Sequence, residues 1–307
     1  MTTPADTTTC ALVIVGGAGA VGGMLAGSAR AQGDSVTVVD SAPHTQESGG
    51  LSGDVTSPGP AMRAALAGAD TVILAVPESV AVDAAPVVDR CMRPGAVLVE
   101  TLSVKSRIHR VLAESAPTRP AVGINPLFAP GLGVSGRPVA AVVHHHSPAV
   151  DRFLGAVTGW GARVVAMDAD EHDRIAAATQ ALTHAAVLAF GLALGDLDVD
   201  ADTLVGAATP PHAALLALLA RVGSGAPAVY HDIQSGNPHA TSARTALAAA
   251  LRRLSDVVAE GDEREFGDLM AAALAPLGDH VDDYRALCAD VFGGPLAPRE
   301  RSEGGTR

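Results

Sequence analysis

Aromatic residues are scarce in this chain: they make up 3% of its 307 residues, with one Trp, two Tyr and five Phe. Hydrophobic residues nevertheless account for 48% of the sequence. A core of this composition consists mainly of Ala, Val and Leu, which suits helices and buried parallel strands. Because a chain of this length exceeds a typical single core, the sequence predicts two domains.

Basic residues are also in the minority, with 21 against 33 acidic residues and a formal net charge of -12. Such a chain lacks the basic face that releases counter-ions from nucleic acid, so we expect neither DNA nor RNA as a partner. A local basic pocket for an anionic substrate remains compatible with this balance. Lysine is almost absent: Lys105 is the only lysine, and the other basic residues are arginines.

Cysteine is sparse as well. Cys10, Cys91 and Cys288 are far apart and show no CxxC or metal-ligand spacing. An odd, low count argues against a disulfide framework and fits a reducing cytoplasm. The N-terminal MTTPADTTTC has no basic segment, and glycines interrupt the apolar run behind it. We therefore expect neither a signal peptide nor a membrane span, and we expect a cytoplasmic location.

Strand-like and helix-like segments alternate through the first half of the chain. Apolar runs typical of buried parallel strands occur at residues 11–15, 35–40, 71–76 and 96–100. Further strands, some of them possible antiparallel neighbours, are expected at residues 121–123, 140–143 and 163–167. Helix-like segments between the strands, such as 24–31, imply right-handed crossovers. The sequence therefore predicts an α/β Rossmann-like, dinucleotide-binding domain over residues 1–167.

The pattern becomes helical from about residue 168. Residues 170–194 fit one long helix that is apolar on most faces, and such a helix belongs in a core or a subunit interface. Further helices are predicted at residues 211–222, 240–260, 262–275 and 276–291. We predict an all-α domain for substrate binding and dimerisation over residues 168–294, and a homodimer built through it. Residues 295–307 are polar and unpatterned, which predicts a disordered tail.

A glycine-rich turn lies between the first strand and the first helix. Gly17, Gly19 and Gly22 form a GxGxxG pattern that includes Ala20 and Val21. Glycines allow a tight turn and close approach of backbone amides to a pyrophosphate, and the helix N-terminus adds partial positive charge. The alternative is a purely structural turn, since a chain with 33 glycines produces some such patterns by chance.

Asp40 favours the cofactor interpretation. It closes the next strand, where an acid can hydrogen-bond the adenosine ribose hydroxyls. No Arg or Lys follows it closely, so a 2′-phosphate would meet a carboxylate without a counter-charge, and NAD is favoured over NADP. Val76 and Pro77 end the third apolar run and are expected beside the cofactor. The alternatives are that Asp40 lies on the surface and that Pro77 simply ends a strand.

Three segments, taken in order, carry a family resemblance. They are LSVK at 102–105, GINPLFAP at 123–130, and EHD at 171–173 followed by QALTH at 180–184. The chain resembles the prephenate dehydrogenase family, which has an SVK turn, a G-x-HP-M-F-G-P loop and an EHD…QAL-x-H helix. The resemblance extends over about residues 11–291. It implies a Rossmann-like domain, a helical domain, and an active site in the cleft between them.

The resemblance also implies a reaction. The family converts prephenate to 4-hydroxyphenylpyruvate: a hydride leaves the ring carbon that bears the hydroxyl, and the ring carboxylate departs as carbon dioxide. The expected substrate is therefore a cyclohexadienyl dicarboxylate. The enzyme has to hold its two carboxylates and position the reacting C–H over the nicotinamide.

Several residues match family positions. Ser103 matches a serine that hydrogen-bonds near the reacting hydroxyl; the alternative is an N-cap for the helix that follows. His184 matches a histidine that contacts substrate, with Gln180 one turn earlier on the same face; the alternative is a satisfied core histidine. For Lys105 we expect a role toward substrate, cofactor or loop structure, the alternative being a solvated turn lysine.

The sequence departs from the family at two points. Asn125 stands where the family has its catalytic histidine, and asparagine cannot act as a base; its carbonyl can only accept a hydrogen bond. A general base contributes about 10²–10⁴-fold, so ordinary prephenate oxidation should be badly impaired. The family arginine that pairs with a substrate carboxylate aligns near His239, and Arg244 is close enough in sequence to replace it.

Two hypotheses explain the missing base. In the preferred one, the 4-substituent is an amine, and 4-amino-4-deoxyprephenate is converted to 4-aminophenylpyruvate. An amine keeps an N–H donor toward Asn125, and its lone pair can expel the hydride without a strong base. The resembling family includes such enzymes, associated with aminophenylalanine-derived antibiotics. In the other hypothesis the protein is a silent NAD-binding sensor. Standard prephenate or arogenate oxidation, or another hydroxyacid or imine dehydrogenation, are further alternatives.

Three consecutive histidines, His144, His145 and His146, look like a metal-binding tract. Successive residues on a strand point to opposite faces, so the three could not hold one ion in regular structure. No carboxylate or cysteine is spaced to complete a site. We therefore predict no metal site and expect surface histidines at a strand end.

Overall fold

The computed structural model describes residues 9–42 and 50–293. Contacts divide the chain into two compact units. The first holds the described residues up to Ala177 together with His231–His239, and the second holds Ala178–Tyr230 and the described residues from Ala240 onward. The break thus follows Ala177, whereas the sequence predicts a boundary between residues 167 and 168. The predicted tail, 295–307, lies outside the described residues.

Within the described residues, the first unit is built on an eight-stranded sheet of order β3-β2-β1-β4-β5-β6-β7-β8. Neighbouring strands are parallel except β6 and β7, so β7 and β8 run against the other six. The strands are β1 (Ala11–Val15), β2 (Ser35–Asp40), β3 (Leu51–Ser52), β4 (Thr71–Leu74), β5 (Val97–Glu100), β6 (Ala121–Pro126), β7 (Pro138–His145) and β8 (Arg163–Ala166). The predicted α/β class is confirmed.

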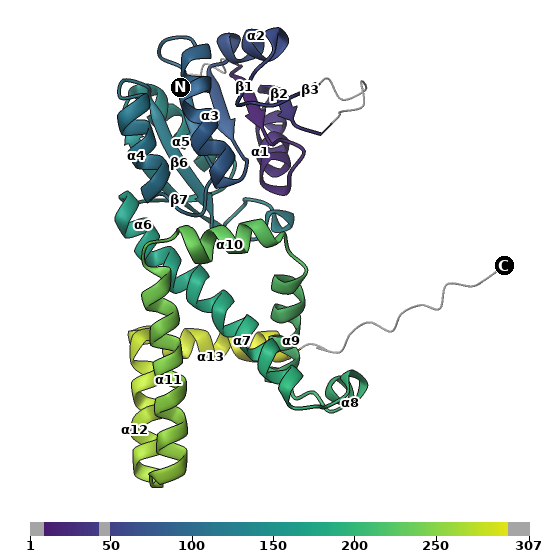
Figure 1. Cartoon of the computed structure of the whole chain (residues 1–307), viewed down its shortest axis with the longest axis vertical. Helices are drawn as coiled ribbons and strands as arrows, with labels where there is room; N and C mark the ends of the chain where they lie inside the picture. The colour runs from purple at the N-terminus through teal and green to yellow at the C-terminus, as the bar shows by residue number, and fades with distance from the viewer. Residues whose placement is uncertain (1–8, 43–49, 294–307) are drawn as a thin grey trace, which may run out of the picture. The chain divides into compact units, whose positions relative to one another are not determined.

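Alternate residues of the central strands face opposite layers of helices. On β1, Val13 and Val15 belong to one buried cluster, and Leu12 and Ile14 belong to the other. The first cluster is completed by apolar residues of α2 (Pro60–Gly68), α3 (Glu78–Cys91) and α4 (Ser106–Ser115). The second is completed by α1 (Ala20–Ala31) and α5 (Pro148–Gly159). Helices therefore cover both faces of the sheet (Figure 1), which explains the continuous apolar runs.

The boundaries differ from the sequence prediction at informative places. The helix α1 begins at Ala20, before the predicted residue 24, because Gly19 already provides its N-cap in an extended conformation. Glycines in the first turns of α1 lower its helix propensity, so the sequence pattern did not indicate that the helix begins at Ala20. The strand β4 ends at Leu74, two residues earlier than predicted, and Val76 belongs to the loop that follows. The two-residue strand β3 is too short to leave a pattern in the sequence.

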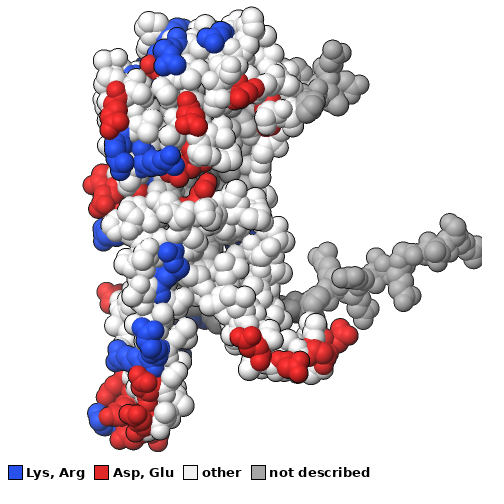
Figure 2. Space-filling model, in the orientation of Figure 1, with Lys and Arg blue, Asp and Glu red and all other residues white. Residues whose placement is uncertain are grey.

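The second unit is helical. Its elements are α7 (Thr183–Asp196), α8 (Ala201–Gly206), α9 (Pro210–Gly223), α11 (Ala240–Glu260), α12 (Glu263–Leu274), a 3-10 turn (Ala275–His280) and α13 (Val281–Phe292). The helix α10 (Pro227–Gly236), which the sequence did not predict, contributes residues to both units. Acidic side chains gather over α8 and around the turn between α11 and α12 (Figure 2).

The predicted long helix is present as Ala169–Asp196. It consists of α6 (Ala169–Ala176), a π-helical turn (Ala177–Leu182) and α7. By length and composition alone it could cross a membrane, as could α9 and α10 if that bent pair were one span. The core helix of a soluble protein passes the same test. Only 22% of its most apolar stretch is buried within the chain, and Leu192 is 75% exposed. This helix therefore presents an uncovered apolar surface.

Candidate active site

The glycine turn after β1 leaves no room for side chains. Gly16 has φ +79°, and a Cβ there would lie 2.1 Å from the carbonyl oxygen of Ala75. A Cβ on Gly22 would lie 2.3 Å from the carbonyl oxygen of Gly16, and one on Gly17 would lie 2.7 Å from a methyl group of Val38. These approaches bring the turn close to the end of β4 and pack α1 against it. The backbone therefore forms the cradle that a pyrophosphate requires.

The charges around this turn also fit a dinucleotide. The first turn of α1, which begins at Ala20 and Val21, contains no acidic residue, so its N-terminal partial charge is available to an anion. Asp40 ends β2, and its Oδ2 accepts a hydrogen bond from the N–H of Ala18 in the turn at 3.1 Å. The carboxylate therefore lies beside the turn, as the ribose interpretation requires. The residues present fit an adenine dinucleotide.

The loop after β4 lies beside the same turn. A methyl group of Val76 is 3.0 Å from the position of a Cβ on Gly16, and Pro77 is the N-cap of α3. Glu78 follows, 7% exposed, with its Oε1 buried and unpaired within the described residues. Burial raises the pKa of Glu78, and Arg107, 3.7 Å away, only partly offsets it. Glu78 is not among the residues predicted from sequence, although an acid that follows a buried strand so closely is an available signal.

Lys105 is buried, which contradicts the alternative of a solvated turn lysine. Its Nζ donates to both carboxylate oxygens of Glu100 at 2.9 Å and to the carbonyl oxygen of Ile124 at 3.1 Å. Lys105 is 0% exposed, so this arrangement does not support the predicted direct contact with substrate. Burial raises the pKa of Glu100, but the charge of Lys105 and the hydrogen bond from His144 outweigh it and lower that pKa overall.

Gly123 makes room for this ion pair, because a Cβ there would lie 1.8 Å from Glu100 Oε1. His144 lies beside the pair: its Nε2 is 3.0 Å from Glu100 Oε1, and its Nδ1 is 2.9 Å from Nδ1 of His109. His144 is 8% exposed, so the expectation of surface histidines is wrong for this residue. His144 is buried because it pairs with the buried carboxylate of Glu100.

The other two histidines of the tract have separate partners. His145 Nδ1 lies 3.1 Å from the carbonyl oxygen of Arg119, and His146 Nε2 lies 3.1 Å from Asp151. Within the described residues, no group of three or more His, Cys, Asp or Glu side chains is arranged to hold a metal ion.

Asn125 is buried on β6 and belongs to a hydrogen-bonded chain of side chains. Its Nδ2 lies 3.1 Å from Nε2 of His172, and Nδ1 of His172 lies 2.8 Å from Oδ1 of Asp173. Asn125 is 3% exposed, His172 1% and Asp173 0%. In the sequence, His172 and Asp173 stand out only as part of the EHD segment of the family pattern, without a role of their own. The contact between β6 and α6 that joins them is not visible in sequence spacing.

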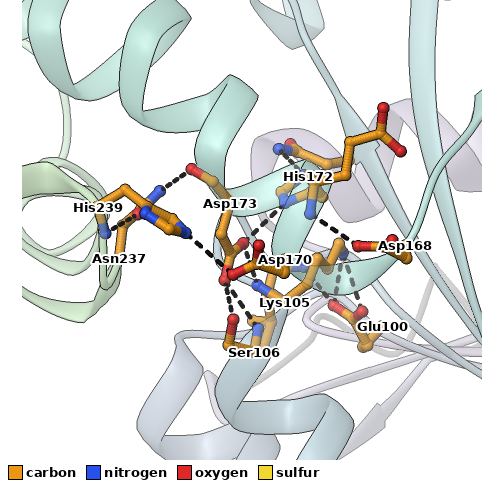
Figure 3. Close-up of polar contacts among 12 residues, drawn as sticks. Glu100, Lys105, Ser106, Asp168, Asp170, His172, Asp173, Asn237 and His239 are labelled. Carbon is orange, nitrogen blue, oxygen red and sulfur yellow. Dashed lines mark hydrogen bonds and ion pairs between the residues drawn. The ribbon is translucent and has the colours of Figure 1, made fainter.

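Asp173 also anchors the loop that contains Lys105 (Figure 3). Its Oδ1 accepts from the N–H of Lys105 at 2.8 Å, and its Oδ2 accepts from the N–H and the hydroxyl of Ser106 at 2.9 and 2.5 Å. Burial raises the pKa of Asp173, but the hydrogen bonds from His172, Ser106 and the backbone outweigh it and lower that pKa overall. The carboxylate therefore stays ionised.

Ser103 is half-buried in the loop between β5 and α4. The helix α4 begins at Ser106 with Lys105 at its N-cap and no side-chain cap, so the alternative N-cap role of Ser103 is wrong. Its predicted contact with the reacting substituent stays a prediction.

The two residues considered for carboxylate binding fall in different units. His239 lies in the first unit, where its Nε2 is 3.1 Å from Oδ1 of Asp170. Its N–H donates to Asn237 Oδ1, and Asn237 Nδ2 donates to the carbonyl oxygen of Asp173 (Figure 3). Arg244 lies on α11 in the second unit and donates to Thr241 Oγ1 at 3.2 Å. Their roles toward a substrate carboxylate stay predictions.

Gln180 and His184 lie in the second unit, on the π-helical turn and on α7. Oε1 of Gln180 and Nδ1 of His184 are both buried without a hydrogen-bond partner among the described residues. Burial, and then the charge of Arg221, lower the pKa of His184, whose ring packs edge-on against Tyr230 at 4.8 Å. Buried unpaired polar atoms are rare in folded proteins and need an explanation. A polar ligand that pairs with them is the explanation their positions favour.

Comparisons with known proteins identify the family. A family model described as "Prephenate dehydrogenase, dimerization domain" matches residues 168–272. The 4-amino-4-deoxyprephenate dehydrogenase of Streptomyces pristinaespiralis is 54% identical over 282 residues, covering 91% of this chain and 95% of the relative.

Two solved structures are similar in fold. One is prephenate dehydrogenase from A. aeolicus in complex with hydroxyphenyl propionate and NAD+, with a TM-score of 0.69, 17% identity, and coverage of 92% of this chain and 99% of that chain. The other is Synechocystis arogenate dehydrogenase, with a TM-score of 0.66, 17% identity, and coverage of 89% and 99%. Because the Streptomyces relative is 54% identical over 91% of this chain, this chain belongs to the prephenate dehydrogenase family.

Proposed function

We propose that the protein catalyses the NAD-dependent oxidative decarboxylation of 4-amino-4-deoxyprephenate to 4-aminophenylpyruvate. The observation that carries the proposal is Asn125, a buried residue that can accept a hydrogen bond but cannot take a proton. The relative that is 54% identical over 91% of this chain is named for this substrate.

The chemistry divides between the cofactor and the residues of this chain. NAD supplies the acceptor for the hydride that leaves ring carbon 4. Its pyrophosphate would be held by the turn of Gly17, Gly19 and Gly22, and its adenosine ribose by Asp40. Loss of the ring carboxylate as carbon dioxide leaves the electron pair that completes the aromatic ring, so no oxidant besides NAD is needed.

Asn125 suits an amine better than a hydroxyl at carbon 4. A hydroxyl has to lose its proton as the hydride leaves, which in such sites calls for a general base. A neutral amine has a lone pair that stabilises the developing positive charge, and aromatisation then restores an uncharged aniline. In this reaction Asn125 has only to orient the amine by accepting an N–H. A protonated histidine at the same position would repel an ammonium group.

The test is steady-state NADH formation with 4-amino-4-deoxyprephenate and with prephenate, for the wild type and for Asn125→His. We expect turnover of the amino compound by the wild type and a gain of prephenate activity of about a hundredfold in the variant, from the restored base. His146→Asn, at an exposed histidine, is the matched control and should behave like the wild type.

The other outcomes separate the alternatives. Equal or faster oxidation of prephenate or arogenate by the wild type would reject the amine proposal. No turnover of any of these substrates, together with measurable NAD binding, would identify a sensor that keeps the fold without the activity.

We also propose a cytoplasmic homodimer that forms through the second unit. The free cysteines fit the location. Exposed apolar side chains at the end of the long helix fit the assembly, since Leu192 is 75% exposed and Leu197, the C-cap of α7, is 68% exposed. Sedimentation velocity should show a dimer that Leu192→Glu weakens. Leu132→Glu, at a residue of the first unit that is 57% exposed, is the matched control. A wild-type monomer, or a protein that sediments with membranes, would contradict this assembly.

A further inference from the structure

The chain of hydrogen bonds behind Asn125 fixes which way its amide points. His172 lies between the amide of Asn125 and the carboxylate of Asp173, and all three side chains are buried. An amide can be turned over so that its oxygen and nitrogen exchange places, and the two arrangements present opposite hydrogen-bonding character to a ligand. The neighbours of His172 decide between them.

Asp173 determines which nitrogen of His172 carries the proton. An ionised carboxylate can only accept hydrogen bonds, so His172 Nδ1, 2.8 Å from Asp173 Oδ1, has to be the N–H end of the ring. The neutral ring then has a lone pair at Nε2, which can only accept. A carboxylate that holds an imidazole in one tautomer in this way is a well-established device in enzymes.

The tautomer in turn orients Asn125. Since Nε2 of His172 accepts, the atom of Asn125 that lies 3.1 Å from it has to be the donor, Nδ2. The carbonyl oxygen of Asn125 is then the end that has no hydrogen bond to another residue in the part of the chain that the structure describes. With the opposite tautomer, the amide would turn over and present its NH₂ group instead.

We propose that His172 is a positioning residue which holds Asn125 with its carbonyl oxygen directed to the substituent at ring carbon 4. The site then recognises a hydrogen-bond donor at that carbon, such as the N–H of an amine. This inference rests on the proposed function for the identity of the substituent, whereas the orientation of the amide follows from a neutral His172 whose Nδ1 proton points to Asp173. Recognition of a donor at carbon 4 is thus shared by Asn125 and two residues of α6 that do not have to touch the substrate.

The first test compares inhibition by two product-like acids, 4-aminophenylpyruvate and phenylpyruvate, of which only the first has a donor at carbon 4. The wild type should bind the amino compound about five- to tenfold more tightly, the usual effect of one hydrogen bond. In His172→Phe, which keeps a ring but has no acceptor, this ratio should fall to about one, with unchanged affinity for NAD and for phenylpyruvate.

Four further variants, one of them a double variant, separate positioning from a general structural role. His172→Gln retains an acceptor oxygen and should recover part of the affinity ratio that His172→Phe loses. Asn125→Ala should abolish the ratio, and adding His172→Phe to it should then change nothing more. His146→Phe, at an exposed histidine, should keep the wild-type ratio. A His172→Phe variant that keeps the ratio, or that weakens both acids and NAD equally, would overturn the proposal.

A second measurement needs no variant. Nitrogen NMR of the wild-type protein labelled with ¹⁵N-histidine should assign His172 as a neutral ring with its proton on Nδ1; a proton on Nε2 would overturn the proposal. If the wild type oxidises prephenate and not the amino compound, the proposed function fails. The positioning role of His172 is then still tested by the ratio of the two inhibitor affinities, measured with 4-hydroxyphenylpyruvate in place of 4-aminophenylpyruvate.

Discussion

Lys105 Nζ lies 2.9 Å from each carboxylate oxygen of Glu100, and the side chains of the two residues are 0% and 2% exposed. The same ammonium group donates to the carbonyl oxygen of Ile124, the residue before Asn125. The only lysine of the chain therefore joins the ends of β5 and β6 next to the residue that distinguishes this protein from the family pattern. Arginine would bring a wider, planar group to a space that fits an ammonium.

Lys105→Met should destabilise the protein by about 3–5 kcal/mol, because it leaves a buried carboxylate without its partner. Urea unfolding monitored by circular dichroism measures the loss. Arg285→Met is the matched control: its pair with Asp282 is 79% and 89% exposed, so the change should stay within about 0.5 kcal/mol. Equal stabilities of the two variants would show that the buried pair does not hold the loop.

Gly22→Ala should weaken NAD binding at least about tenfold, since its Cβ would lie 2.3 Å from a backbone oxygen of the glycine turn. Gly27→Ala is a matched control on the same helix, because a Cβ there meets no atom within 4 Å. That control should bind NAD normally and gain about 0.4–1 kcal/mol of stability. Isothermal titration with NAD distinguishes the two; normal affinity in Gly22→Ala would place the cofactor elsewhere.

Asp40→Ala should let the protein use NADP. Removing the carboxylate eliminates the repulsion of a 2′-phosphate and also removes the acceptor for the ribose hydroxyls of NAD. We expect the ratio of kcat/KM for NAD over NADP to fall by about tenfold or more, as for the loss of one charged hydrogen bond. Asp34→Ala is the control at the opposite end of β2, where Asp34 Oδ1 accepts from the N–H of Cys10. If both variants keep the NAD preference, Asp40 does not contact the ribose.

Asp173 should make stability depend on pH at the acidic end. Its folded-state pKa lies below the ordinary pKa of an aspartate, so the stability it contributes is present above that ordinary pKa and is lost as pH falls through the folded pKa. Asp173→Asn should therefore be less stable than the wild type at pH 7, with a difference that shrinks toward pH 3. Asp170→Asn, at a side chain that is 78% exposed, is the control and should show little effect at either pH. Thermal unfolding across this range tests the prediction; a constant difference would mean that the carboxylate is not ionised in the fold.

Much of the first unit could be predicted from local patterns. The buried runs of β1, β4 and β5 are continuous because helices cover both faces of the sheet, and Gly16 to Gly22 form a turn whose backbone geometry excludes side chains. The position of Asp40 at the end of β2 followed from the same reasoning, because parallel strands end at one edge. Asn125 was identifiable as a departure from the family because a single substitution in a motif replaces the histidine that takes the proton with a side chain that cannot.

What the sequence alone determined is thus the order of elements, the cofactor turn and the replacement of the family histidine by Asn125, since each depends on neighbours along the chain. Tertiary structure decided the rest. Lys105 and His144 are buried because Glu100 needs partners, and His172 orients Asn125 because the fold brings it within hydrogen-bond distance of a residue 47 positions away in sequence. Hydrogen bonds between distant segments leave no periodic signal in the sequence. A buried charge has to be paired, and the tertiary fold determines which residue lies close enough to pair with it.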